Sequence, residues 1–195
     1  MAKYGVVETT KITEICYDME SSTVDIENGW VVAKGDLLTG ERNIYAAGIP
    51  AVTDKVYLVA NPAWSYDNRL SAQGEDQFIN VRNKPFKVYG LAETNKFGVT
   101  DYTITPVDAV TPIAIGDYIG VDGTTMKLAD LGTSEPDGAE VGFIGRVVEI
   151  ENTGIYPCLN VCTVTAPAGT PPVGGGEIVP EGKKIIIEVV QNKTV

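Results

Sequence analysis

The sequence of 195 residues contains no histidine. Histidine is the side chain that changes charge near neutral pH, and it is also the commonest general base and a frequent zinc ligand. Its absence excludes every Ser-His and Cys-His catalytic arrangement. We therefore predict a protein that is not an enzyme, with no catalytic residues, no metal site and no cofactor.

Cysteine is scarce as well, with only Cys16, Cys158 and Cys162. The stretch "YPCLNVCTV" has the composition of a β-strand, in which Cys158 and Cys162 would lie on one face, about 13 Å apart at the usual rise per residue. That separation is too long for a disulfide between them. We interpret all three as buried thiols of a protein made in a reducing compartment.

Basic residues and long apolar runs are also few. The 26 acidic residues outnumber the 15 basic ones, which are scattered, and the net charge is -11. Such a chain repels polyanions, so we predict no nucleic-acid partner. No apolar run approaches the ~18 residues of a membrane span. The start, "MAKYGVVETTKITEI", lacks the pattern of a signal peptide, and we expect folding in a cytoplasm and no membrane partner.

What the sequence does contain is a β pattern. Gly, Pro, Asn or Asp interrupts β-branched and aromatic residues about every 6 to 12 positions, a spacing typical of all-β sandwiches and barrels. A chain of this size buries about 70% of its surface, which is enough for a hydrophobic core that needs no disulfide or metal ion to stabilise it. The expected strands are 5–8, 24–26, 30–33, 43–47, 55–60, 86–92, 96–103, 118–121, 125–128, 141–149 and 159–164.

Two stretches resemble each other: "KGDLLTGERNIYAAG", residues 34–48, and "IGDYIGVDGTTMKLAD", residues 115–130. Each opens with Gly-Asp and turns at or near a glycine, so we predict two hairpins. We interpret Asp36 and Asp117 as residues that accept hydrogen bonds from turn amides at the solvent rim. The alternative is a catalytic carboxylate pair, which would need to lie about 5 to 9 Å apart in a cleft.

The dipeptides Asn28-Gly29 and Asp122-Gly123 favour tight hairpin turns, because they supply positive φ angles. Residues 61–80, by contrast, break the strand rhythm and are expected to form a long loop. Loops of this kind often carry contacts, and Trp64 and Tyr66 are candidate contacts to a partner protein. Their alternative role is a lid packed on the end of the barrel.

We divide the chain into an N-terminal arm or first strand (1–19), a β-barrel-like core domain (20–165), a Gly/Pro-rich linker (166–182) and a C-terminal strand (183–195). The last strand contains Ile185, Ile186 and Ile187, which cannot remain in water without inviting aggregation. They pair either with the chain's own sheet or, as candidate partner contacts, with a neighbouring subunit.

The segment "DIENGWVVAKGDLLTGERNIYAAGIPAVTDKVYLVANP", followed by "FKVYGLAETNKFGVTDYTI" and "IGDYIGVDGTTMKL", resembles the capsid decoration, or head auxiliary, proteins of tailed phages and prophages of Gram-positive bacteria. The stretch "VTAPAGTPPVGGGEIV" is similar to the opening of another group of phage cement proteins. The resemblance implies a virion protein on the capsid exterior that binds the major capsid protein. It also suggests a homo-oligomer, with a trimer as the guess, because capsid lattices offer threefold positions.

Three functions follow from these observations. The first is a decoration protein that reinforces the capsid lattice. The second is an adhesin or carbohydrate-binding module on a virion fibre, in which Trp30, Trp64, Tyr66 and Tyr89 stack on sugar rings. The third is a hydrolase that uses acidic residues alone, for which only the abundance of Asp and Glu speaks.

Overall fold

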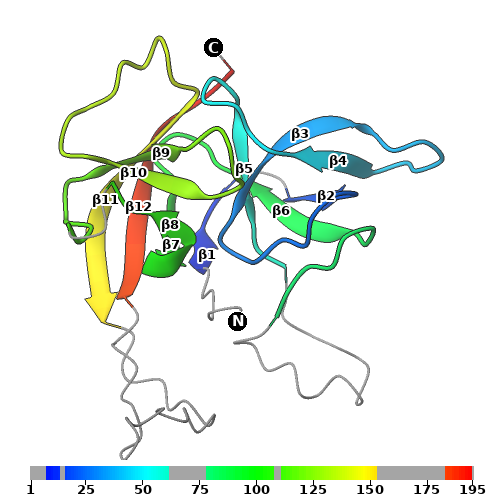
Figure 1. Cartoon of the computed structure of the whole chain (residues 1–195), viewed down its shortest axis with the longest axis horizontal. Coiled ribbons are helices and arrows are strands. Elements are labelled where there is room, and N and C mark those ends of the chain that lie inside the picture. The colour runs from blue at the N-terminus through cyan, green and yellow to red at the C-terminus, as the bar shows by residue number, and fades with distance from the viewer. Residues whose placement is uncertain (1–7, 14–15, 62–77, 108–110, 153–182, 195) are drawn as a thin grey trace, which may run out of the picture.

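The computed structural model describes residues 8–13, 16–61, 78–107, 111–152 and 183–194. It consists of two β units, an open, curled seven-stranded sheet and a closed five-stranded barrel, which lie side by side (Figure 1). The all-β prediction is confirmed. The only helical element among the described residues is the 3-10 turn η3 (Asp101–Thr103).

The open sheet, which we call sheet A, has the order β1-β7-β12-β11-β9-β10-β8. All its neighbours are antiparallel except β8 and β10, which pair in parallel. Its strands are β1 (Glu8–Lys11), β7 (Lys96–Thr100), β8 (Ile104–Thr105), β9 (Tyr118–Val121), β10 (Leu128–Gly132), β11 (Phe143–Asn152) and β12 (Lys183–Asn192).

The C-terminal strand β12 lies in the middle of sheet A, with β11 on one side and β7 on the other. Of the two alternatives for this strand, pairing with the chain's own sheet is therefore the one observed. Ile185 and Ile187 point into the core, and Ile186 is only 8% exposed on the opposite face. The side chains of Ile185 and Ile187 are buried within the chain and leave no surface for the partner contact predicted there, whereas the contact predicted at Ile186 stays a prediction.

The barrel closes in the order β2-β4-β3-β5-β6, with β6 paired back to β2. Its strands are β2 (Cys16–Glu20), β3 (Val31–Leu37), β4 (Ile44–Gly48), β5 (Val56–Val59) and β6 (Phe86–Gly90). Only β2 and β4 are parallel. The strand β2 was not predicted, because "CYDME" is short and half polar.

Two apolar clusters hold the fold together. The first joins the inner face of sheet A to the barrel wall, since Val31, Val56 and Leu58 of the barrel belong to it. The second fills the barrel interior around Met19 and Phe86. Because side chains alternate along a strand, neighbouring residues of β3 and β5 serve different clusters. Sheet A and the barrel are thus packed against each other through the first cluster, to which both contribute side chains.

The first Gly-Asp stretch forms the β3–β4 hairpin and the second forms the β9–β10 hairpin, as predicted. The turn at Asp122-Gly123 is not tight, however, because β10 begins only at Leu128. Its loop reaches the barrel, where Met126 is buried in the second cluster and its carbonyl accepts a 2.8 Å hydrogen bond from the Val31 amide.

The Asn28-Gly29 prediction is half right. Gly29 has a φ of +89°, and a turn forms in which the Trp30 amide donates to the Glu27 carbonyl at 3.4 Å. The turn does not make a hairpin, since Ile26 instead bridges to Asn80. A single bridge replaces the expected strand 24–26, because the flanking residues 22–25 are exposed and have no apolar face to bury.

The predicted segments fall differently on this architecture. The arm 1–19 contains β1 of sheet A and β2 of the barrel, and the core 20–165 is divided between the two units. The linker 166–182 and the predicted strand 159–164, with Cys158 and Cys162, lie outside the described residues. So does most of the predicted strand 5–8, while β1 continues to Lys11.

Candidate interaction surface

The face of sheet A that points away from the core is rich in charge. Alternation along the strands, together with register shifts in β1 and β11, places on it a set of mostly polar side chains from β1, β7, β9, β11 and β12 that we call the outer face. The outer face consists of Glu8, Lys11, Lys96, Gly98, Tyr118, Arg146, Glu149, Glu151, Lys184, Ile186 and Glu188.

Cross-strand register sorts these charges into rows. Arg146, Glu188 and Lys96 are direct neighbours across β11, β12 and β7, and the Lys96 Nζ lies 3.2 Å from a Glu188 carboxylate oxygen. In another row, Glu151 lies opposite Lys184. Opposite charges in directly paired positions stabilise a sheet modestly, so the rows favour this register over a shifted one.

Lys184 is the most buried of these charges, with 15% of its side chain exposed. Its ammonium lies between Glu8 of β1 and Glu151 of β11, 3.0 Å from a Glu151 oxygen. The hydrogen bond to Glu8 raises the pKa of Lys184, against the effect of burial. The same hydrogen bond lowers the pKa of Glu8, with a smaller contribution from Thr10. The three residues therefore form a charged clasp across β1, β12 and β11.

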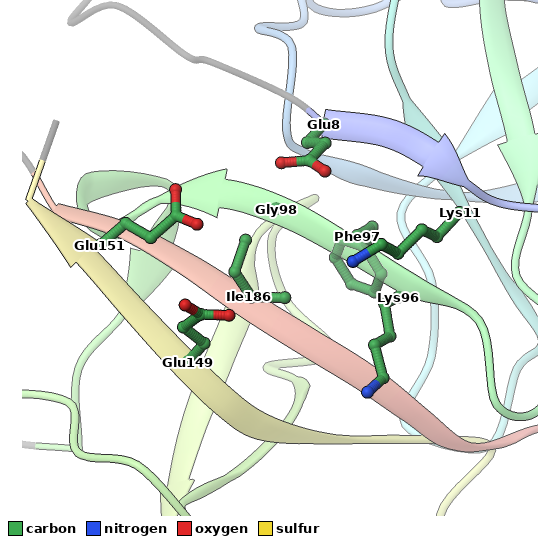
Figure 2. Close-up of a pocket in the computed structure, with 8 residues that line it drawn as sticks. All are labelled: Glu8, Lys11, Lys96, Phe97, Gly98, Glu149, Glu151 and Ile186. Carbon is green, nitrogen blue, oxygen red and sulfur yellow. The ribbon is translucent and has the colours of Figure 1, made fainter.

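A shallow depression lies beside this clasp (Figure 2). Gly98 is one of the residues that line it, and the Lys184 and Ile186 side chains pack closely over this glycine: a Cβ there would lie 2.8 Å from the Lys184 Cε and 3.0 Å from the Ile186 Cδ1. In Figure 2 Ile186 lies beside Gly98, Glu149 and Glu151 lie on the β11 side, and Lys11 and Lys96 lie on the other. A depression lined mostly by charged side chains of both signs suits contact with a polar surface of another protein.

Three positions next to undescribed parts of the sequence meet at this face. Glu8 follows residues 1–7, while Asn152 and Lys183 flank residues 153–182. Register places Asn152 opposite Lys183, and the clasp holds Glu8 beside them. The described positions that border residues 1–7 and 153–182 in the sequence therefore lie at the edge of the outer face.

The other predicted contacts, Trp64 and Tyr66, lie outside the described residues. The residue that precedes their segment is held in place by its neighbours. Asn28 and Asn61 exchange two hydrogen bonds, of 2.8 and 3.0 Å. Asn80 donates to the Asn28 side chain at 3.1 Å. These three asparagines fasten Asn61 to the turn at Gly29 and to the chain that returns at Asn80.

The two Gly-Asp aspartates lie in different β units. Asp117 is buried and accepts a 2.7 Å hydrogen bond from the Ala114 amide, the predicted turn-shaping role, although away from the solvent rim. Asp36 is exposed on β3, and no hydrogen bond to its side chain is seen among the described residues. Within those residues, no group of three Cys, Asp or Glu could hold a metal ion.

Of the predicted sugar-stacking aromatics, two are described. Trp30 packs against the cluster inside the barrel, with Lys127 over its ring at 5.5 Å. Tyr89 lies on β6, opposite Cys16 on one side and Leu58 on the other. Trp30 therefore has the core role that its place in "GWVVA" allows, rather than that of an open stacking platform.

Comparison with known proteins adds no relative, because no family model, no curated protein and no solved structure matches this chain. The described part of the chain has no helix with the length and apolarity that a membrane span requires. Sequence reasoning missed Lys184 and Gly98 as parts of one surface. The only available signal was the alternation of Lys184, Glu188 and the isoleucines in "KKIIIEVV".

Proposed function

We propose that this chain is a non-enzymatic structural protein of a phage virion, which binds the outer surface of the capsid and reinforces the lattice of major capsid protein. The observation that carries the proposal is the outer face of sheet A, a broad surface of both charge signs backed by a continuous core. The resemblance of residues 20–130 to capsid decoration proteins supports it. A protein that binds only the assembled lattice stabilises that lattice by mass action.

The size of the outer face sets a requirement on the contact. The five strands of the outer face, at ~4.8 Å spacing, are about 19 Å wide, and five residues along a strand span about 17 Å, giving a projected area of roughly 320 Å². Each partner in a specific interface contributes about 800 Å². The contact therefore extends beyond the sheet, and segments 1–7 and 153–182 adjoin it in sequence.

The test mixes the purified chain with expanded capsids that lack it, and measures binding by co-sedimentation. Wild-type protein is expected to saturate a fixed number of sites per capsid. A variant with Arg146→Glu and Glu149→Lys reverses two exposed charges of the outer face and should bind at least tenfold more weakly. The matched control, Asp36→Lys with Arg42→Glu, reverses two exposed charges on the β3–β4 hairpin, likewise with no change in net charge, and should bind like wild type.

The experiment tests the proposed function and the proposed contact surface separately. Failure of the wild-type protein to bind such capsids contradicts the proposed function. Capsid binding that both double variants retain equally would leave the function standing but place the contact elsewhere. The trimer remains a prediction, which light scattering of the purified chain tests.

A further inference from the structure

Three tyrosines on three strands of the barrel point toward one another. Tyr17 of β2 meets Tyr45 of β4 edge to face, with ring centroids 6.3 Å apart and an interplanar angle of 84°. It meets Tyr57 of β5 in the same way, at 5.6 Å and 85°. All three rings are partly buried and pack against the apolar cluster inside the barrel. We call these three residues the tyrosine box.

The tyrosine box already holds one cation over two of its rings, Lys34, and the Lys55 ammonium lies farther out, 5.7 Å from the centroid of Tyr57. The Lys34 Nζ lies 3.8 Å from the centroid of Tyr45 and 4.4 Å from that of Tyr17. Among the described residues, no carboxylate lies within 4.0 Å of this ammonium. Ring faces rather than an acidic partner therefore hold the charge. This is how proteins recognise organic ammonium groups, because the face of an aromatic ring carries partial negative charge.

We propose that the tyrosine box is a binding site for organic ammonium cations, in which Lys34 is a built-in competitor. A quaternary ammonium group is the ligand that fits best, since it needs ring faces and no hydrogen-bond acceptors. The net charge of -11 raises the local concentration of any cation. This site is separate from the outer face of sheet A, and the inference does not rest on the proposed capsid role.

Lys34 is placed so that it can leave. It lies at the point where the register of β3 against β4 shifts, between Lys34 and Leu37, and the residues that follow it, Gly35 to Leu37, are exposed. Its flexible side chain can turn outward without disturbing the pairing of Val31 to Ala33 with β5. The apparent affinity for an external cation then equals the affinity of the empty box multiplied by the fraction of time that Lys34 leaves the box open.

The experiment titrates tetramethylammonium chloride into full-length protein and follows binding by NMR, with sodium chloride at equal ionic strength as reference. Lys34→Ala is expected to bind tetramethylammonium about tenfold or more tightly than wild type, because the competitor is gone. Lys34→Ala with Tyr45→Leu should lose this binding. Lys127→Ala, which removes the ammonium over Trp30, should behave like wild type. Methylammonium in a parallel titration distinguishes a preference for quaternary from primary ammonium groups.

A second measurement uses the wild-type chain, so the test does not depend on the folding of any variant. The Lys34 Nζ lies over two ring faces, so the protons on the adjoining Cε are expected to resonate upfield of their usual position. Tetramethylammonium should move them toward that usual position as Lys34 leaves the box.

A folded Lys34→Ala protein that does not bind tetramethylammonium would overturn the proposal and leave Lys34 as a structural plug. Equal binding with and without Tyr45 would do so too. If Lys34→Ala does not fold, Lys34→Gln and the wild-type shifts decide, and unmoved Lys34 resonances contradict the site.

Discussion

Asn192 and Val56 exchange two hydrogen bonds across the joint between sheet A and the barrel. The Asn192 Nδ2 donates to the Val56 carbonyl and its Oδ1 accepts from the Val56 amide, both at 2.9 Å. The Nδ2 also donates to the Leu91 carbonyl at 2.9 Å. The Asn192 side chain thus forms the same pair of hydrogen bonds that a backbone peptide group would. It links the end of β12 to β5 and to Leu91, the residue after β6.

Asn192→Asp tests this joint. The substitution keeps the shape of the side chain but replaces its two donated hydrogen bonds by a carboxylate oxygen that faces two carbonyls. We expect the free energy of unfolding to fall by about 2 to 4 kcal/mol, since partly buried groups lose their partners. Urea denaturation measures the change. Asn43→Asp, at an exposed position before β4, is the control and should shift it by less than about 0.5 kcal/mol.

Because β12 lies in the middle of sheet A, truncating a buried side chain and an exposed side chain of this strand should change the free energy of unfolding by very different amounts. Ile187 is fully buried in the shared core, whereas Val190 is 40% exposed. Ile187→Ala should lower the free energy of unfolding by about 2 to 5 kcal/mol, because it leaves a cavity, and Val190→Ala by much less. Thermal and urea melts compare the two. Loss of self-association without loss of stability in Ile187→Ala would contradict the role of β12 within its own sheet.

Gly142 approaches another stretch of backbone closely. A Cβ at this position would collide with the Asp54 carbonyl oxygen and would lie 2.6 Å from the Thr53 carbonyl. Because backbone cannot move as easily as a flexible side chain, Gly142→Ala should destabilise the protein by about 1 to 3 kcal/mol. Gly48→Ala is the matched control, since nothing lies within 4 Å of its added Cβ. Similar melting temperatures for the two variants would contradict this packing.

Asp122 gives a prediction about pH. Burial alone would raise its pKa, but hydrogen bonds from the side chains and amides of Thr125 and Thr124 outweigh burial and lower the pKa to about 2. A carboxylate with a depressed pKa stabilises the fold fully above its unfolded pKa of 3.8, and this contribution is lost as pH falls toward 2.

The stability difference between wild type and Asp122→Asn should therefore be largest above about pH 4 and shrink as pH falls toward 2. Urea denaturation at a series of pH values follows it. Asp36→Asn is the control. A difference that stays constant from pH 7 to pH 2 would show that the hydrogen bonds do not depend on the charge of Asp122.

Local patterns predicted most of the strands. Alternation and turn residues placed Tyr118–Val121 correctly and put β3, β4, β5, β6 and β11 within a few residues of their ends. They failed where local preference and tertiary pairing disagree. Thr125 has a β-branched side chain, yet it donates to Asp122 in the turn and leaves β10 to begin at Leu128.

The candidate surface was less accessible to sequence reasoning. The outer face assembles β1, β7, β11 and β12, which are far apart in sequence, and only register brings Glu8, Lys184 and Glu151 together. The tyrosine box likewise draws on three separate strands. Neither arrangement has a fixed spacing in the sequence. The isoleucines of the last strand, by contrast, were correctly expected to need a partner strand, and the choice between the two candidates needed the structure.

The position of β12 also bears on the order in which the chain folds. All five barrel strands lie between residues 16 and 90, so they can pair while the ribosome is still adding later residues, and Met126 completes the cluster inside the barrel afterwards. Sheet A cannot form in this way, because the strand that joins β7 to β11 is synthesised after both. Until it arrives, the apolar faces of β7 and β11 stay open to solvent and to other nascent chains, and pairings so distant in sequence form slowly.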